Sequence, residues 1–107
     1  MTDHVQVLTT VGSEEDAERI SVALVERRLA ACVQTVGPIA SRYRWRGEVA
    51  AATEWQCLAK TEAGRYAEVE AAIRELHPYE LPAIHAVAMQ RVFAPYAAWV
   101  GSNSSGG

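Results

Sequence analysis

The chain has 107 residues, half of them hydrophobic, and its formal net charge at pH 7 is −3. This length is typical of one domain with a single core, and the apolar fraction is sufficient for folding without disulfide staples. The small negative charge and the lack of a basic tract argue against nucleic acid or an anionic membrane as a partner. No apolar run approaches the roughly 20 residues of a membrane span, and the N-terminus lacks a signal pattern, so we expect a cytoplasmic protein.

The first elements are a strand and a helix. Residues 5–11 alternate apolar and polar side chains, which indicates a strand that ends at Gly12. Ser13 is a good helix N-cap, and the three acidic residues 14–16 suit the positive end of a helix. Apolar residues at helical spacing then predict a helix that reaches about Arg28.

A second strand is predicted over residues 29–36, with a bend or bulge where Gly37 and Pro38 interrupt it. Residues 40–61 then read as a long hairpin, because they alternate, turn near residues 47–51 and alternate back. One face of its first strand carries Tyr43 and Trp45, and the other carries Arg42, Arg44 and Arg46. The arginines suit either solvent or a neighbouring subunit. The hairpin is too long for one small core to cover, so its outer part needs a hydrophobic partner or another copy of the chain.

The remaining elements are a helix, a short strand and a helical turn. Apolar residues over 64–77 have helical spacing, and the helix should end at His77 because Pro78 follows. Residues 83–89 alternate as a fourth strand, and residues 96–100 after Pro95 suggest a terminal helical turn. The order predicts an α+β, ferredoxin-like βαββαβ domain over residues 1–101, followed by a disordered Gly and Ser tail over residues 102–107.

The two cysteines, Cys32 and Cys57, do not form a disulfide framework. With a turn near residues 47–51, Cys57 would lie opposite the region of Arg42, roughly 30 Å from Cys32 at ~3.3 Å per residue. We therefore expect two reduced thiols, Cys32 as a small core residue and Cys57 as a sheet residue. A reactive or metal-binding role is the less favoured alternative.

The most specific local string is residues 77–82, which read His, Pro, Tyr, Glu, Leu, Pro. The two prolines restrict the backbone around an imidazole, a phenol and a carboxylate, which are groups that bind a metal or a polar ligand. A structural role is the favoured reading on residue types alone. A histidine suits the last turn of a helix, and Glu80 suits solvent or an arginine partner.

Several short strings together resemble the CutA divalent-ion tolerance proteins. They span nearly the whole chain in the family's order and spacing: residues 31–34, 37–39, Ser41, Tyr43, Trp45, Gly47, Glu54, Lys60, Thr61, residues 77–80, Pro82, Tyr96 and Trp99. The resemblance implies a ferredoxin-like subunit that assembles as a homotrimer through its long strands, with a build similar to the PII signalling trimers. It also implies a cytoplasmic protein linked to tolerance of copper and other divalent cations.

The resemblance implies metal ligands only in part. Some relatives carry a cysteine on the first strand and a second histidine before the His-Pro pair, and this chain has Thr9 and Leu76 at those positions. His77 remains, and Cys32 is a second candidate by chemistry, since imidazole suits copper(II) and thiolate suits copper(I). Copper or another divalent cation is thus expected to bind weakly or between subunits. The sequence gives no sign of an organic cofactor.

The sequence and the resemblance leave three hypotheses for the function. The first is a trimeric divalent-cation binding and tolerance protein. The second is a PII-like signalling trimer that binds an unidentified small molecule in inter-subunit clefts, although the same residues would equally serve trimer assembly. The third, an enzyme, is disfavoured because no nucleophile has a base nearby in sequence and no Gly-rich phosphate loop follows a strand. The predicted cleft residues are Tyr43, Trp45, Glu54, Lys60, Tyr79, Glu80 and Trp99.

Overall fold

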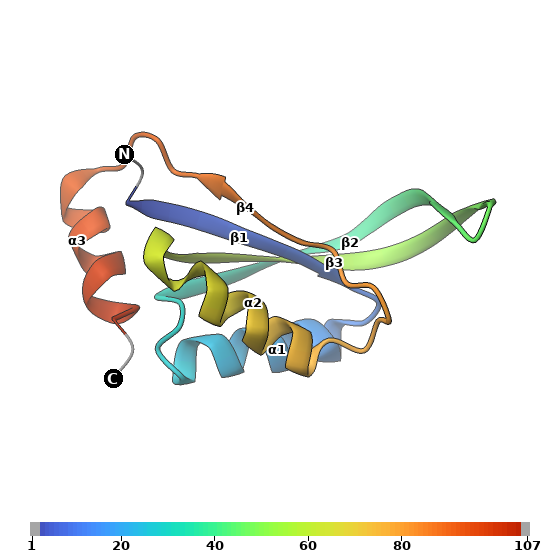
Figure 1. Cartoon of the computed structure of the whole chain (residues 1–107), viewed down its shortest axis with the longest axis horizontal. Coiled ribbons are helices and arrows are strands. Elements are labelled where there is room, and N and C mark those ends of the chain that lie inside the picture. Colours follow the sequence, from blue (N-terminus) through green and yellow to red (C-terminus); the bar gives the residue numbers. More distant parts are fainter. Residues whose placement is uncertain (1–2, 106–107) are drawn as a thin grey trace.

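The computed structural model describes residues 3–105, which form an α+β fold of four strands and three α-helices (Figure 1). The elements in chain order are β1 (His4–Val11), α1 (Glu14–Glu26), β2 (Cys32–Trp45), β3 (Glu48–Glu62), the 3-10 turn η1 (Ala63–Arg65), α2 (Tyr66–Leu76), β4 (Ile84–Ala88) and α3 (Ala94–Asn103). The predicted βαββαβ order followed by a terminal helix is confirmed.

The strands form one antiparallel sheet in the order β2-β3-β1-β4. Helices α1 and α2 lie together along one side of this sheet, and α3 lies near the N-terminal end of β1 (Figure 1). The core between helices and sheet is built from apolar side chains of β1, β3, α1 and α2. Neither α1 nor α2 covers the opposite face of the sheet, and the hairpin of β2 and β3 extends beyond the body (Figure 1).

The helix limits follow from local chemistry. At the start of α1, the Ser13 hydroxyl accepts a hydrogen bond from the Asp16 amide at 3.1 Å, as an N-cap should. The helix α2 ends at Leu76, and His77 is already extended with ψ 131°, because Pro78 disfavours a helical conformation in the residue before it. Both features agree with the prediction from sequence.

The hairpin turn is tighter than predicted, and the expected turn near residues 47–51 is wrong. Trp45 pairs with Glu48, so only Arg46 and Gly47 form the turn, with φ values of 51° and 83°. Two residues with positive φ give a turn whose twist matches that of the flanking strands. Residues 50–52 are therefore ordinary strand residues of β3.

The new register also corrects the placement of the cysteines. Cys57 pairs with Thr35 rather than with the region of Arg42, and Cys32 pairs with Lys60. Thr35, the partner of Cys57, lies three residues from Cys32 along β2. Because side chains alternate between the two faces of a strand, the two thiols point to opposite faces of the sheet. Both are free, as expected, but it is Cys57 that lies in the core while Cys32 is half-buried.

The start of β2 also differs from expectation. Strand β2 begins at Cys32 because the amides of Leu29 and Ala30 both bond to the Leu24 carbonyl, which continues the end of α1. The expected irregularity is confirmed between Val36 and Ile39, where the Gly37–Pro38 peptide is cis.

The predicted disorder after Gly101 is wrong for residues 102–104. Helix α3 continues to Asn103, and the fully buried Ser104 donates a hydrogen bond from its hydroxyl to the Val100 carbonyl at 2.7 Å. This bond and the surrounding packing fix a segment whose composition resembles a linker. Gly106 and Gly107 lie outside the described residues. Within residues 3–105, no helix is long and apolar enough to cross a membrane.

Candidate functional site

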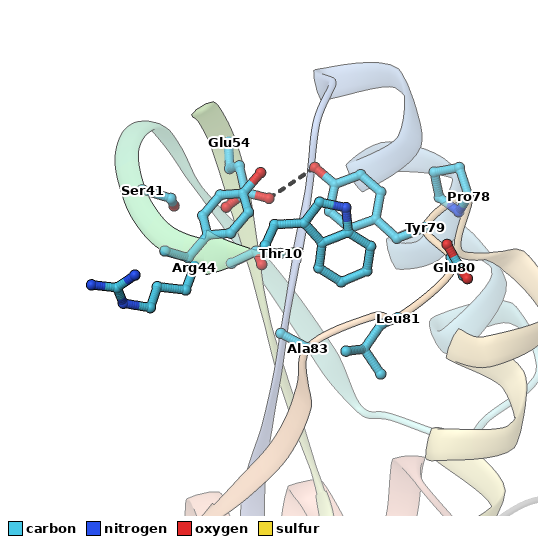
Figure 2. A pocket seen from close by; sticks show the side chains of 11 residues that line it. Thr10, Ser41, Arg44, Glu54, Pro78, Tyr79, Glu80, Leu81 and Ala83 are labelled. Carbon is cyan, nitrogen blue, oxygen red and sulfur yellow. Dashed lines mark hydrogen bonds between the residues drawn. The ribbon is translucent and has the colours of Figure 1, made fainter. Parts of the chain in front are cut away.

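The main cavity of the chain lies between the hairpin and the loop that joins α2 to β4 (Figure 2). It has a volume of about 680 Å³. Side chains from β1, β2, β3 and this loop line it: Thr10, Ser41, Tyr43, Arg44, Trp45, Glu54, Pro78, Tyr79, Glu80, Leu81 and Ala83. The cavity therefore combines three aromatic rings, aliphatic groups and two carboxylates.

Glu54 is the buried polar group of this cavity. It lies on β3 opposite Ile39, and only 6% of its surface is exposed. The Tyr79 hydroxyl donates a hydrogen bond to Glu54 Oε2 at 2.8 Å, and the two side chains point toward each other (Figure 2). Burial, and then the neighbouring Glu54 carboxylate, raise the pKa of Tyr79 to about 12. Tyr79 is therefore a protonated hydrogen-bond donor at neutral pH.

His77 fixes the loop that carries Tyr79. Its ring is 8% exposed, with Nε2 at 2.7 Å from the Thr10 carbonyl and Nδ1 at 3.1 Å from the Tyr79 amide. A carbonyl can only accept and an amide can only donate, so these partners assign the proton to Nε2 and the lone pair to Nδ1. His77 thus joins the end of β1 to the loop and orients Tyr79 toward Glu54.

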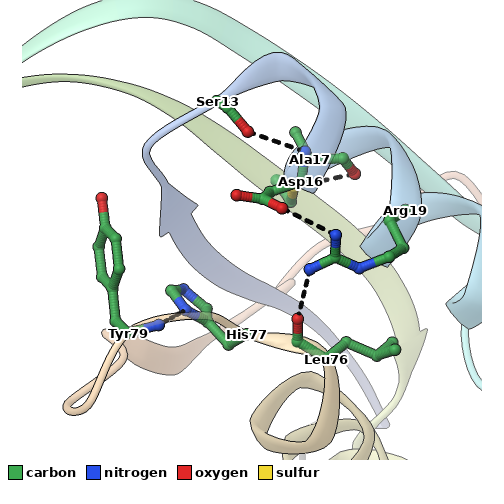
Figure 3. A network of polar contacts seen from close by, with 8 residues as sticks. Ser13, Asp16, Ala17, Arg19, Leu76, His77 and Tyr79 are labelled. Carbon is green, nitrogen blue, oxygen red and sulfur yellow. Dashed lines mark hydrogen bonds and ion pairs between the residues drawn. The ribbon is translucent and has the colours of Figure 1, made fainter.

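A second contact holds the end of α2 against α1 (Figure 3). Arg19 forms an ion pair with Asp16 at 2.8 Å, and its other terminal nitrogen donates to the Leu76 carbonyl at 2.7 Å. The arginine therefore satisfies a carbonyl that the helix end leaves without an intrahelical partner. Together with His77, it gives the loop a fixed starting point on the body.

The candidate metal ligands do not form a ready metal site within one subunit. Both ring nitrogens of His77 already have hydrogen-bond partners. Cys32 lies at the level of Lys60 and Gln6, four residues along the sheet from Thr10, or roughly 13 Å at ~3.3 Å per residue. Residues 3–105 contain no group of three or more His, Cys, Asp or Glu side chains placed to hold an ion. A preformed divalent-cation site in the isolated subunit does not fit this arrangement.

The structure brings together five of the seven predicted cleft residues: Tyr43, Trp45, Glu54, Tyr79 and Glu80. The other two lie elsewhere. Lys60 is six residues from Glu54 along β3 and donates to the Gln34 side chain, while Trp99 stacks on Tyr96 in α3 with ring centres 5.8 Å apart.

Sequence reasoning missed several residues of this cavity. Ser41 shares the alternation of Tyr43 and Trp45, so it could have been placed on the same face. Thr10 could not have been placed at the cavity from sequence, since its position depends on the register between β1 and β3. An arginine partner was one of the two roles expected for Glu80, and the structure supplies it as Arg46, whose ion pair with Glu80 at 3.1 Å links the turn of the hairpin to the loop.

Comparison with known proteins decides the family. A family model described as CutA1 divalent ion tolerance protein matches residues 5–103. The divalent-cation tolerance protein CutA of Thermus thermophilus is 42% identical over 98 residues, which cover 92% of this chain and 95% of that protein. The chain belongs to the CutA family.

Solved CutA structures share the whole fold. The Thermus thermophilus protein superimposes with a TM-score of 0.92 at 40% identity, covering 94% of this chain and 98% of that one. A CutA from Archaeoglobus fulgidus, described as a periplasmic divalent cation tolerance protein, has a TM-score of 0.92 at 36% identity, covering 94% and 98% of the two chains. The predicted fold and the resemblance to the family are thus confirmed.

Proposed function

We propose that this chain is a non-enzymatic, homotrimeric protein of divalent-cation tolerance. The observation that supports assembly is the sheet face opposite α1 and α2, which neither of these helices covers (Figure 1). The exposed apolar residues Val36, Tyr43, Trp45 and Val87 lie on that face, each with 39–45% of its surface exposed. The 14-residue strand β2 also forms a free sheet edge.

Other copies of the chain are the natural cover for this surface. An exposed apolar sheet face and a long edge strand promote association, and a three-fold heterologous contact closes such edges in a ring. The trimer that the family resemblance implies would use the same long strands. The neighbouring copies would pack on the sheet face opposite α1 and α2 (Figure 1).

The test of assembly is light scattering on the purified protein at micromolar concentration, where we expect the mass of three subunits. Trp45→Ala should lower that mass with little change in circular dichroism, because its ring lies outside the subunit core. The control is Val22→Ala, which removes a similarly exposed apolar side chain (45%) from α1. A monomeric wild type would refute the proposal.

Divalent cations, copper among them, would then bind weakly or at contacts between subunits, since residues 3–105 of one subunit offer no complete ligand set. Calorimetric titration of copper(II), with zinc(II) for comparison, tests this in wild type, His77→Ala and the control His85→Ala. We expect weak saturable binding of about one ion or fewer per subunit, lost in His77→Ala and kept in His85→Ala. Tight binding that is indifferent to both histidines would exclude His77 as a ligand.

A second candidate function is small-molecule binding at the main cavity, coupled to PII-like signalling. The observation in its favour is the 680 Å³ cavity with a buried carboxylate and three aromatic rings. Pockets of this size, with a few polar groups on an apolar lining, are the usual form of ligand sites. If the same residues only join subunits, substitutions at Glu54 will change the oligomeric state instead of ligand affinity.

We propose a cytoplasmic location. Its support is the pair of free thiols, which suits a reducing compartment. The Archaeoglobus relative is described as periplasmic, so the location needs a direct test. Fractionation of expressing cells, with the protein recovered in the cytoplasmic fraction, is the expected result.

A further inference from the structure

We propose that the main cavity binds an organic cation, an amine or guanidinium carried on an apolar body. This inference rests on the second candidate function, because it names the class of small molecule that the cavity takes. Three observations support it: the charge of the cavity, its aromatic lining, and the guanidinium of Arg46, which already lies against the Trp45 ring.

The charge of the cavity is set by Glu54. A carboxylate removed from water is costly unless charged or hydrogen-bonded partners compensate it. In residues 3–105, the Tyr79 hydroxyl is the only side chain that donates to Glu54, and no basic side chain forms an ion pair with it. One neutral donor compensates only part of a negative charge. A cation in the cavity would complete the compensation.

The other charged residues around the cavity do not supply that cation. Arg44 follows the alternation of β2, and its guanidinium points away from Tyr79 and Glu54 (Figure 2). Arg46 is engaged with Glu80, at 3.1 Å. Because Glu80 has a basic partner, whereas Glu54 has none among the described residues, the unbalanced charge is negative and lies at Glu54.

The aromatic lining suits the same kind of ligand. Tyr43, Trp45 and Tyr79 each leave more than a third of their surface uncovered. The faces of such rings attract cations, and they do so more strongly where water is excluded. The guanidinium carbon of Arg46 lies 5.4 Å from the centre of the Trp45 ring, so this surface already holds one organic cation.

The lining also separates an organic cation from other ligand classes. An anion would meet the Glu54 carboxylate, and Arg44, the one basic residue that lines the cavity among residues 3–105, directs its guanidinium away from it (Figure 2). Calcium and magnesium require about six oxygen ligands, and the cavity offers one buried carboxylate among rings and aliphatic groups. Pro78 and Leu81 would instead contact the apolar body of an organic ligand.

The test is calorimetric titration of the assembled protein at pH 7 with 2-phenylethylamine, using uncharged 2-phenylethanol and anionic phenylacetate as probes of similar shape. We expect saturable binding of the amine, at least about tenfold tighter than that of the alcohol, because the charge is what Glu54 recognises. Glu54→Gln should weaken amine binding by about tenfold or more and leave alcohol binding unchanged.

The matched control is Glu48→Gln, which removes the same charge from β3 at the tip of the hairpin, outside the cavity. It should bind the amine as wild type does. Light scattering on Glu54→Gln checks that its oligomeric state is unchanged. If this variant dissociates, Glu54 serves the contact with another copy and the inference is overturned.

The remaining outcomes separate the ligand class from the function. Equal binding of the alcohol or of phenylacetate would overturn the organic cation while leaving small-molecule binding in place. No binding of any of the three probes would refute both the inference and the function on which it rests.

Discussion

The most informative perturbation is a pair of identical substitutions, Thr9→Val and Thr61→Val, on the helix-covered face of the sheet. Thr9 is 2% exposed, and its hydroxyl is buried without a hydrogen-bond partner among the described residues. Thr61 is fully buried, and its hydroxyl donates to the Leu29 carbonyl at 2.7 Å. The same chemical change should therefore have opposite effects on stability.

The magnitudes follow from the hydroxyl groups. Replacing an unsatisfied buried hydroxyl by a methyl group should raise the free energy of unfolding by about 1 kcal/mol. Removing the hydrogen bond of Thr61, which leaves the Leu29 carbonyl without this donor, should lower it by about 1 to 2 kcal/mol. The two variants should thus differ by about 2 to 3 kcal/mol, or about 1 to 2 M in the urea midpoint at an unchanged m-value.

The assay is urea unfolding followed by circular dichroism, at one fixed protein concentration because assembly would contribute to stability. Each midpoint is compared with that of the wild type. If Thr9→Val destabilises the protein as much as Thr61→Val does, the Thr9 hydroxyl has a partner and the reasoning is wrong.

Three further predictions concern single positions. Gly37→Ala should lower the unfolding midpoint, because the added Cβ would lie 2.4 Å from Trp55 Cδ1; a wild-type midpoint would contradict this. Since the pKa of Tyr79 is raised to about 12 from 10, the unfolded state loses this proton first, so stability should fall between pH 10 and 12. In Tyr79→Phe that part of the pH dependence should vanish, as measured by urea unfolding across this range. Finally, burial raises the pKa of the Cys57 thiol, so it should react with a thiol reagent at pH 8 only as fast as the protein opens, and rapid labelling in Cys32→Ser would contradict this.

Much of the fold could be predicted because its signals are local. The N-cap at Ser13, the stop before Pro78 and the alternation of Tyr43 with Trp45 each depend on a few neighbouring residues. The hairpin turn could not be placed in the same way. Arg46 adopts a positive φ that favours glycine, and its position follows from the pairing of two long strands rather than from its own side chain.

At the end of the chain, amino-acid composition led to a wrong prediction of disorder. Small polar residues after Gly101 are typical of a linker, yet Ser104 is fully buried and bonded to Val100. Such burial depends on where α3 packs, which the residues of the tail do not encode.

The site was predictable to the extent that it follows sequence periodicity. The residues that the prediction grouped correctly come from one face of the hairpin of β2 and β3 and from one loop. Lys60 shares that face with Glu54 but lies roughly 20 Å further along β3. The occupation of both His77 nitrogens could not be foreseen, since it depends on the Thr10 carbonyl of a distant strand.

The unbroken pairing of the outer hairpin limits how this arm can change length in evolution. From Ile39 opposite Glu54 to Trp45 opposite Glu48, each residue of one strand faces one residue of the other. Loss of a single residue before Tyr43 would turn the rings of Tyr43 and Trp45 to the face of the sheet that now carries the arginines of β2. Loss of two residues from each strand would keep every side chain on its present face. Insertions and deletions in this arm should therefore be tolerated in pairs.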